Sequence, residues 1–161
     1  MKATDRSFRD TMAQVVSAVA VATAYDGDRP VGQTVSSFMS VSLTPPTGLI
    51  SLHQCSRLRP LAAEGKILGL NVLGATQRPI AEAFAKRASA QFDHIAWDIR
   101  DGAPRLLERH GWVALRLARI IEVEDHSLLI GGVVSCEPGA GKPLTHWRRG
   151  YGVHAPGVPL T

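Results

Sequence analysis

Short apolar runs with a period of two, separated by turn residues, recur along most of this chain, a pattern typical of antiparallel β-strands. The first run begins at Val15 and ends at Asp26-Gly27, a dipeptide typical of a β-hairpin turn. The run 31–38 is then the returning strand, and Pro45-Pro46 excludes regular structure after it. The other strands that we predict are 48–53, 67–73, 112–123, 127–136, 144–147 and 151–154.

Two of these runs also predict which side chains share a face. Alanines occupy alternate positions 18, 20, 22 and 24 of the first run. Alanine favours helix, so propensity and periodicity disagree, but the turn that follows favours a strand. This thin face is small enough to pack closely against a second surface. In the longest run the side chains expected to point inward are Val113, Leu115, Leu117, Ile121 and Val123, with Arg119 the exception.

Three short helices are expected beside the strands. The segment 1–13 spaces Phe8 and Met12 four apart, the segment 58–63 stops before Gly65, and the third helix has Pro79 in its first turn. Because strands do not alternate with helices, a Rossmann domain is excluded. The chain is predicted to be mainly β, an antiparallel barrel with two or three short flanking helices. One side of the third helix would carry Ile80, Ala83, Phe84 and Arg87.

Composition limits the class of protein further. With 161 residues, 45% of them apolar, the chain is long enough for one domain with its own core; we assign it to 1–154, with 155–161 as a loose tail. A formal charge of +4 suits an anionic small molecule, and no Lys/Arg block is long enough for a nucleic-acid tail. Two cysteines exclude a disulfide framework and favour a cytoplasmic setting. No signal peptide or membrane-spanning run is expected.

Two stretches suggest a ligand site, each with a plainer alternative. The segment 32–46, GQTVSSFMSVSLTPP, ends a strand in hydroxyls and prolines, so its free backbone groups suit the edge of a flat polar ring; the alternative is a solvent-facing edge strand. Next, Ser56, Arg57 and Arg59 precede a predicted helix, where backbone N–H groups and arginines suit a phosphate. The alternative is Ser56 as an N-cap beside two solvated arginines.

Two later stretches carry further candidates. His126 follows Asp125 at the start of a strand and suits a ligand donor or an acid/base; the alternative is a turn histidine exposed to water. The other histidines show no acidic partner that suggests a metal site. The segment 147–151 combines Trp147 and Tyr151 with two arginines, which suits a charged ring; the alternative is a cationic hairpin with Trp147 as a core plug. Nucleophile-elbow, P-loop and dinucleotide fingerprints are missing.

The order of these blocks resembles the flavin reductase-like family over nearly the whole chain. The family's most specific block, G-x-T-x-x-S-F-x-S-V-S-x-x-P-P, matches 32–46. Two departures stand out: Glu124 precedes the aspartate–histidine pair where the family often has glycine, and the closing hairpin is less rich in tyrosine. The other matching blocks are Phe8-Arg9-Asp10, Val19 to Gly27, Ser56-Arg57, Asn71-Val72-Leu73, Phe84-Ala85, Trp97, Gly102 to Leu106, Asp125-His126 with Gly131, and a terminal Arg-Gly-x-Tyr-like hairpin.

The resemblance implies a homodimeric split β-barrel of the FMN-binding, Greek-key type. It implies hydride transfer from NADH or NADPH to FMN or FAD, with reduced flavin leaving for a partner monooxygenase. By similarity, His126 is the catalytic candidate and faces the nicotinamide together with Tyr151. The flavin contacts carried over are Thr34, Val35, Ser36 and Ser37 along the isoalloxazine edge, Ser56 and Arg57 at the phosphate, and Asn71, Val72 and Leu73 along the ribityl chain.

Other functions stay open from the sequence. One is a flavin-bound reductase of another acceptor, such as a cobalt corrinoid, and another is a non-catalytic flavin carrier or sensor. A basic barrel for single-stranded nucleic acid is disfavoured, because aromatics are 6% of the chain and interleave with cations only at 147–151. The sequence does not choose between FMN and FAD or between NADH and NADPH, nor between a tightly bound and a released flavin.

Overall fold

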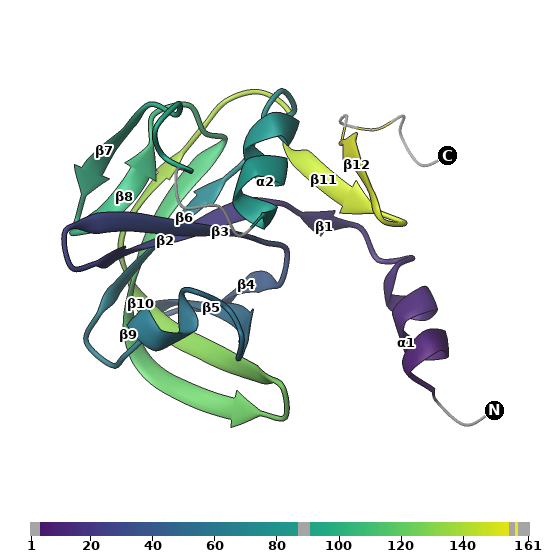
Figure 1. The fold of residues 1–161 in the computed structure, drawn as a ribbon, viewed down its shortest axis with the longest axis horizontal. Coiled ribbons are helices and arrows are strands. Elements are labelled where there is room, and N and C mark those ends of the chain that lie inside the picture. The colour runs from purple at the N-terminus through teal and green to yellow at the C-terminus, as the bar shows by residue number, and fades with distance from the viewer. Residues whose placement is uncertain (1–3, 87–90, 155–156, 158–161) are drawn as a thin grey trace.

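The computed structural model describes residues 4–86, 91–154 and 157, and it is built mainly from antiparallel strands (Figure 1). Two α-helices and one short 3-10 helix accompany the strands: α1 (Asp5–Met12), α2 (Arg78–Ala85) and η1 (Arg59–Leu61). The strands are β1 (Ser17–Ala18), β2 (Ala20–Asp26), β3 (Arg29–Val35), β4 (Phe38–Leu43), β5 (Pro46–His53), β6 (Ile67–Val72), β7 (Trp97–Arg100), β8 (Ala103–Leu106), β9 (Gly111–Val123), β10 (His126–Pro138), β11 (Leu144–Trp147) and β12 (Gly150–Val153). The mainly β, antiparallel class predicted from the sequence is confirmed.

Seven strands form one curled sheet in the order β3-β2-β6-β9-β10-β5-β4. Strands β3 and β4 lie at opposite edges of this order, yet only Ser36 and Ser37 separate them in the chain. Three Cα steps span at most about 11 Å, so the sheet must bend until its two edges approach each other. No ladder joins β3 to β4 in the described residues, and we call the meeting of the two edges the seam. Smaller sheets join β1, β11 and β12, and β7 to β8.

Strand β2 is buried on both faces, which explains its unusual composition. Ala20, Ala22 and Ala24 point into the main core of the curled sheet, where small side chains leave room for larger ones from the facing strands. Val19 and Val21 pack on the other face with α2. Positions 20, 22 and 24 of the alanine face are therefore covered by their own chain, and the interpretation that they pack against a second surface is wrong; Ala18, in β1, is exposed.

Three local predictions need correction. The run 31–38, predicted as one strand, is divided: β3 ends at Val35 and a separate strand, β4, begins at Phe38. Regular structure also resumes at Pro46, where β5 begins, because a proline that opens a strand can lack the N–H. The helix expected at 58–63 is only the three-residue η1. The hairpin β7–β8 was missed, although Asp101-Gly102 at its turn, with both φ angles positive, is a typical hairpin signal. The helix around Pro79 is confirmed as α2, with Ala81 and Phe84 buried; Arg87 lies outside the described residues.

The inward alternation predicted for β9 holds only for its first half. Leu115 and Leu117 are buried, but Ile121 is 43% exposed and Val123 is exposed too. A β-bulge is the cause: Leu117 pairs with Gly131 and Arg119 with Ile130, so Ala118 has no partner on β10. One extra residue inverts which side chains face the core beyond that point.

Helix α1 stands beside the body of the molecule and has no buried residue (Figure 1). The turn between β11 and β12 holds its C-terminal end: Arg148 N–H donates to Ala13 O at 3.0 Å, and Trp147 Nε1 donates to Gln14 O at 3.0 Å. Trp147 is 46% exposed, so it is not a core plug. The loose tail predicted for 155–161 lies outside the described residues apart from Gly157. No helix in the described ranges is long and apolar enough to span a membrane.

Candidate functional site

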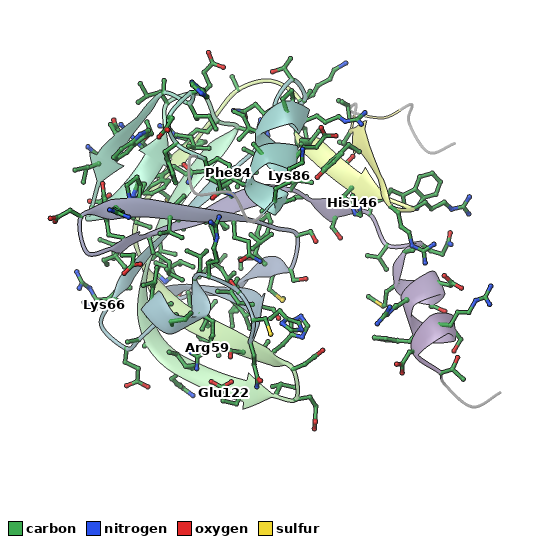
Figure 2. All side chains as sticks on the ribbon, in the orientation of Figure 1. Arg59, Lys66, Phe84, Lys86, Glu122 and His146 are labelled. Carbon is green, nitrogen blue, oxygen red and sulfur yellow. The ribbon has the colours of Figure 1, made fainter. Side chains whose placement is uncertain are left out.

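A pocket of about 270 Å³ opens beside β3, between the β5–η1 turn and the C-terminal end of α2; we call it the central pocket. Within the described ranges, strand β3 pairs with β2 alone, so its other edge can face a ligand. Phe84 and Lys86, at the end of α2, border the pocket (Figure 2). Arg57 also lines it, so two of the lining residues are cations. Its lining residues are Gln33, His53, Cys55, Ser56, Arg57, Phe84, Ala85 and Lys86.

Ser56 and Arg57, the two predicted phosphate ligands, both line this pocket. Ser56 Oγ donates to Gln33 Oε1 at 2.6 Å and accepts from the backbone N–H of Leu58 at 3.2 Å. The hydroxyl therefore stabilises the turn and lines the pocket at the same time. Arg57 donates to the carbonyl oxygen of Gly32 at 3.2 Å and to the side-chain oxygen of Gln91.

Gln91 fixes Arg57 and was not found from the sequence. Its Nε2 donates to the carbonyl oxygens of Ala83 at 3.1 Å and Lys86 at 2.8 Å, so its Oε1 is left to accept from Arg57. Both carbonyls belong to the C-terminal end of α2 or the residue after it. No sequence signal connects position 91 with position 57, because the contact depends on how α2 packs against β3.

Arg59 does not belong to the central pocket, although the sequence placed it in the same phosphate site. Its Nε donates to Ser127 Oγ at 2.6 Å, and its terminal nitrogen forms an ion pair with Glu122 (Figure 2). Hydrogen bonds from Ser127 and then Arg59 lower the pKa of the Glu122 carboxyl below its usual value. Arg59 therefore joins η1 to the β9–β10 hairpin and is not a phosphate ligand here.

His126, the catalytic candidate, lies beside an acid and a second histidine. Asp125 Oδ1 accepts from His126 Nδ1 at 2.7 Å, and this hydrogen bond lowers the pKa of the Asp125 carboxyl. Asp125 Oδ2 is 3.7 Å from His53 Nε2, and the two imidazole rings meet edge to face with centroids 5.1 Å apart. His53 therefore has an acidic partner too, the same Asp125.

This arrangement fixes the hydrogens of both rings. The backbone N–H of Cys55 donates to His53 Nδ1 at 3.0 Å, so in the neutral ring the hydrogen is on Nε2, the nitrogen nearer Asp125. In the neutral ring that donates from Nδ1 to Asp125, Nε2 of His126 is the acceptor. Glu124, just before the pair, has φ of 49°, a left-handed conformation that glycine adopts with less strain.

A second, smaller pocket of about 130 Å³ lies farther along β3; we call it the Tyr151 pocket. Thr34 Oγ1 donates to Ala81 O at 2.6 Å and so ties β3 to α2. Tyr151 contacts His146 edge to face at 5.6 Å between ring centroids. Ser37, at the seam, accepts a hydrogen bond from the backbone N–H of Ser51 at 2.8 Å. The pocket is lined by Val19, Thr34, Val35, Ser36, His146 and Tyr151.

The structure does not bring the segment 71–73 to either pocket. Asn71 is fully buried; its Oδ1 accepts from Leu106 N–H at 2.7 Å, and its Nδ2 donates to Val21 O at 3.2 Å. Leu73 is buried in the cluster under α2, and Val72 pairs with Ala20. Asn71 thus joins β6 to β2 and β8. His126 and Tyr151 also lie apart, since His126 adjoins the central pocket through His53 and Tyr151 lines the other one.

Comparison with known proteins agrees with this geometry. The family model "Flavin reductase like domain" matches residues 12–154. The chain belongs to this family. The resemblance inferred from the sequence is thereby confirmed, and with it the expectation that the chain is a flavin reductase.

Individual relatives support the same family. The chain is 32% identical to the NADH-dependent flavin reductase StyB of Pseudomonas fluorescens, covering 95% of this chain and 91% of the relative. A "Probable flavin reductase" of Rhizobium meliloti is 34% identical over 91% of this chain, which spans about half (48%) of that relative's length. Among solved structures, the styrene monooxygenase flavin reductase of Pseudomonas putida aligns with a TM-score of 0.86 and 30% identity, covering 94% of this chain and 99% of that one.

The residues around the central pocket fit a flavin nucleotide. Arg57 and Lys86 supply positive charge for a phosphate, and the backbone along the free edge of β3 supplies polar groups for a ring edge. Phe84 borders the pocket, with its ring buried in the cluster under α2. Within the described residues no group of three or more His, Cys, Asp or Glu side chains is placed to hold a metal ion.

Proposed function

We propose that this chain transfers hydride from NADH or NADPH to FMN or FAD and passes the reduced flavin to a partner oxygenase. The central pocket carries the proposal, because Gln91 holds the Arg57 guanidinium at the pocket wall beside Ser56 and Lys86. A relative named as a styrene monooxygenase flavin reductase supports the oxygenase partner.

Each part of the site then has a task. Ser56, Arg57 and Lys86 bind the flavin phosphate, and the backbone of residues 34–37 borders the ring. His126 orients the nicotinamide through its Nε2, and Tyr151 closes the far end of the site. Asn71, Val72 and Leu73 support the flavin only through the fold.

A flavin held by Ser56, Arg57 and Lys86 would supply the hydride acceptor, and this chemistry needs orientation more than acid–base catalysis. The chain accordingly needs to hold two rings in contact and to keep positive charge near the phosphates. The Asp125–His126 pair is suited to orientation, because the hydrogen bond fixes the imidazole while its other nitrogen remains an acceptor.

Oxidation of NADH, followed by absorbance with and without added FMN or FAD, tests the proposed function. We expect turnover that depends on flavin, and the same assay with NADPH identifies the preferred nicotinamide. Flavin binding without NADH oxidation would leave a flavin carrier or sensor. NADH oxidation only in the presence of a corrinoid would support the other reductase.

His126→Ala should slow flavin reduction at fixed NADH about tenfold, worth roughly 1.4 kcal/mol of barrier. The Kd for flavin should stay within about threefold, because the phosphate ligands are elsewhere. Stopped-flow absorbance of the flavin band measures both quantities. An unchanged reduction rate at every NADH concentration would make His126 a solvated turn residue. His94→Ala, which removes an exposed imidazole that lines neither pocket, is the control and should change neither quantity.

We also propose a homodimer that covers the apolar surface left open by one chain and completes a split barrel around the seam. On the edge strand β4, Leu43 is 83% exposed, and Met39 and Val41 are exposed as well. On α1, Phe8 is 63% exposed and Met12 is exposed. Exposed apolar groups of this size on an edge strand and a detached helix favour a protein partner.

Light scattering at micromolar protein should give twice the 17.3 kDa chain mass. Leu43→Asp should shift the mass toward one chain, because it places a charge on the surface to be covered. Arg119→Asp, also on an exposed strand position but away from these apolar groups, is the control. A single-chain mass for the unmodified protein contradicts the proposed dimer.

A further inference from the structure

A third pocket, of about 370 Å³, lies on the other side of Arg57; we call it the Arg29 pocket. Arg57 lines both this pocket and the central pocket, so its side chain is the wall that they share. Gln91 lines the Arg29 pocket as well, and it holds Arg57 in that position. The lining residues are Asp26, Arg29, Pro30, Val31, Arg57, Leu61 and Gln91.

The three pockets follow one another along β3. Residues 29–31 line the Arg29 pocket, Gln33 lines the central pocket, and residues 34–36 line the Tyr151 pocket. A seven-residue strand is about 23 Å long, so the three pockets border an extended path along one free edge. If a flavin phosphate binds at Arg57, FMN ends there, and only a dinucleotide continues into the Arg29 pocket.

The chemistry of the Arg29 pocket suits a nucleoside. Pro30, Val31 and Leu61 are half-buried and offer apolar surface to a flat base. Asp26 and Arg29 are direct register partners across the β2–β3 hairpin, and both side chains are exposed.

These two opposite charges form no ion pair with each other or with any other described residue, although they face the same pocket. A free carboxylate accepts hydrogen bonds from ribose hydroxyls, as in dinucleotide sites, and a free guanidinium binds a second phosphate.

We infer that the Arg29 pocket binds the adenosine half of FAD, with Arg57 and Arg29 holding the two phosphates and Asp26 the ribose. The inference rests on the proposed function and makes FAD, rather than FMN, the preferred flavin of this chain. NADH also carries an adenosine diphosphate. The flavin is favoured because its own phosphate would lie at Arg57, the wall of this pocket.

Titrations of the intact protein with riboflavin, FMN and FAD, each followed by flavin fluorescence without NADH, test the inference. FAD should bind about tenfold or more tightly than FMN. Arg29→Glu should raise the Kd for FAD about tenfold or more and leave that for FMN within about twofold. Asp26→Asn should raise the Kd for FAD by a smaller factor. Arg119→Glu, the same exposed charge reversal on a residue that lines none of the three pockets, should change neither.

The outcomes separate the two levels of the proposal. If no flavin binds, the proposed function itself fails. If FMN and FAD bind equally to the unmodified protein, or if Arg29→Glu weakens both equally, the Arg29 pocket does not hold the adenosine of FAD. If instead ADP-ribose binding is lost in Arg29→Glu while the FAD and FMN affinities stay equal, the pocket serves the nicotinamide nucleotide and the inference is overturned.

Discussion

Replacing Arg57 with alanine is expected to raise the Kd for FMN by about 10- to 150-fold, the equivalent of roughly 1.5–3 kcal/mol for hydrogen bonds to a charged group. The guanidinium reaches the central pocket already oriented by Gly32 and Gln91, so little side-chain entropy is lost when a phosphate binds. Riboflavin has no phosphate, and its Kd should change less than about threefold. Fluorescence titration with both ligands measures the difference.

Arg59→Ala is the matched control, because Arg59 lies two residues away but contacts Ser127 and Glu122. That variant should lower the melting temperature and leave the ratio of the FMN and riboflavin affinities unchanged. Equal losses of FMN and riboflavin binding in Arg57→Ala would show that Arg57 supports the fold and does not hold the phosphate.

Asn71→Ala is expected to lower the free energy of unfolding by about 2–3 kcal/mol. The substitution leaves the buried N–H of Leu106 and the carbonyl of Val21 without their side-chain partner, and an unpaired buried backbone group costs about 1–3 kcal/mol. For a chain of this length, that loss corresponds to a melting temperature lower by about 4–12 °C. Thermal denaturation followed by circular dichroism measures it.

The affinity for flavin distinguishes a structural role of Asn71 from a direct contact with the flavin. Measured well below the melting temperature, the Kd for FMN should be unchanged, because Asn71 lines neither the central pocket nor the Tyr151 pocket. Asn71→Asp keeps the acceptor for Leu106 and should lose less stability. A raised Kd for FMN with an unchanged melting temperature would instead support the ribityl contact that family resemblance implies.

Local patterns in the sequence were sufficient for most strands, since period-two runs and turn dipeptides depend on neighbouring residues. Alternation failed in β9, where the bulge at Ala118 depends on the pairing with β10 and leaves no mark in the sequence of β9 itself. The hairpin β7–β8 differs, because Asp101-Gly102 is a turn signal but the four-residue strand on each side is too short to show a clear period of two.

The site shows a similar division. Ser56 and Arg57 could be chosen from the sequence, because their place before a turn is a local feature. The different positions of Arg57 and Arg59 could not be predicted from the sequence. Gln91 and Glu122, which hold the two arginines, are 34 and 63 residues away from them in the chain. The contact between His53 and Asp125 also depends on pairing, since β5 lies beside β10 with His53 opposite His126.

The two-residue link between β3 and β4 has a consequence for motion. Every other pair of neighbouring strands in the curled sheet is held by a ladder, whereas the seam is held by the chain at Ser36 and Ser37 and by what lies against it. Local opening at the seam separates β3 from β4 without breaking a ladder of hydrogen bonds, so we expect the sheet to open there first. A ligand that lies along β3 and across the link would hold β3 and β4 together at the seam. Amide hydrogen exchange would then slow together in β3 and β4, two strands that share no hydrogen bonds and lie six places apart in the sheet.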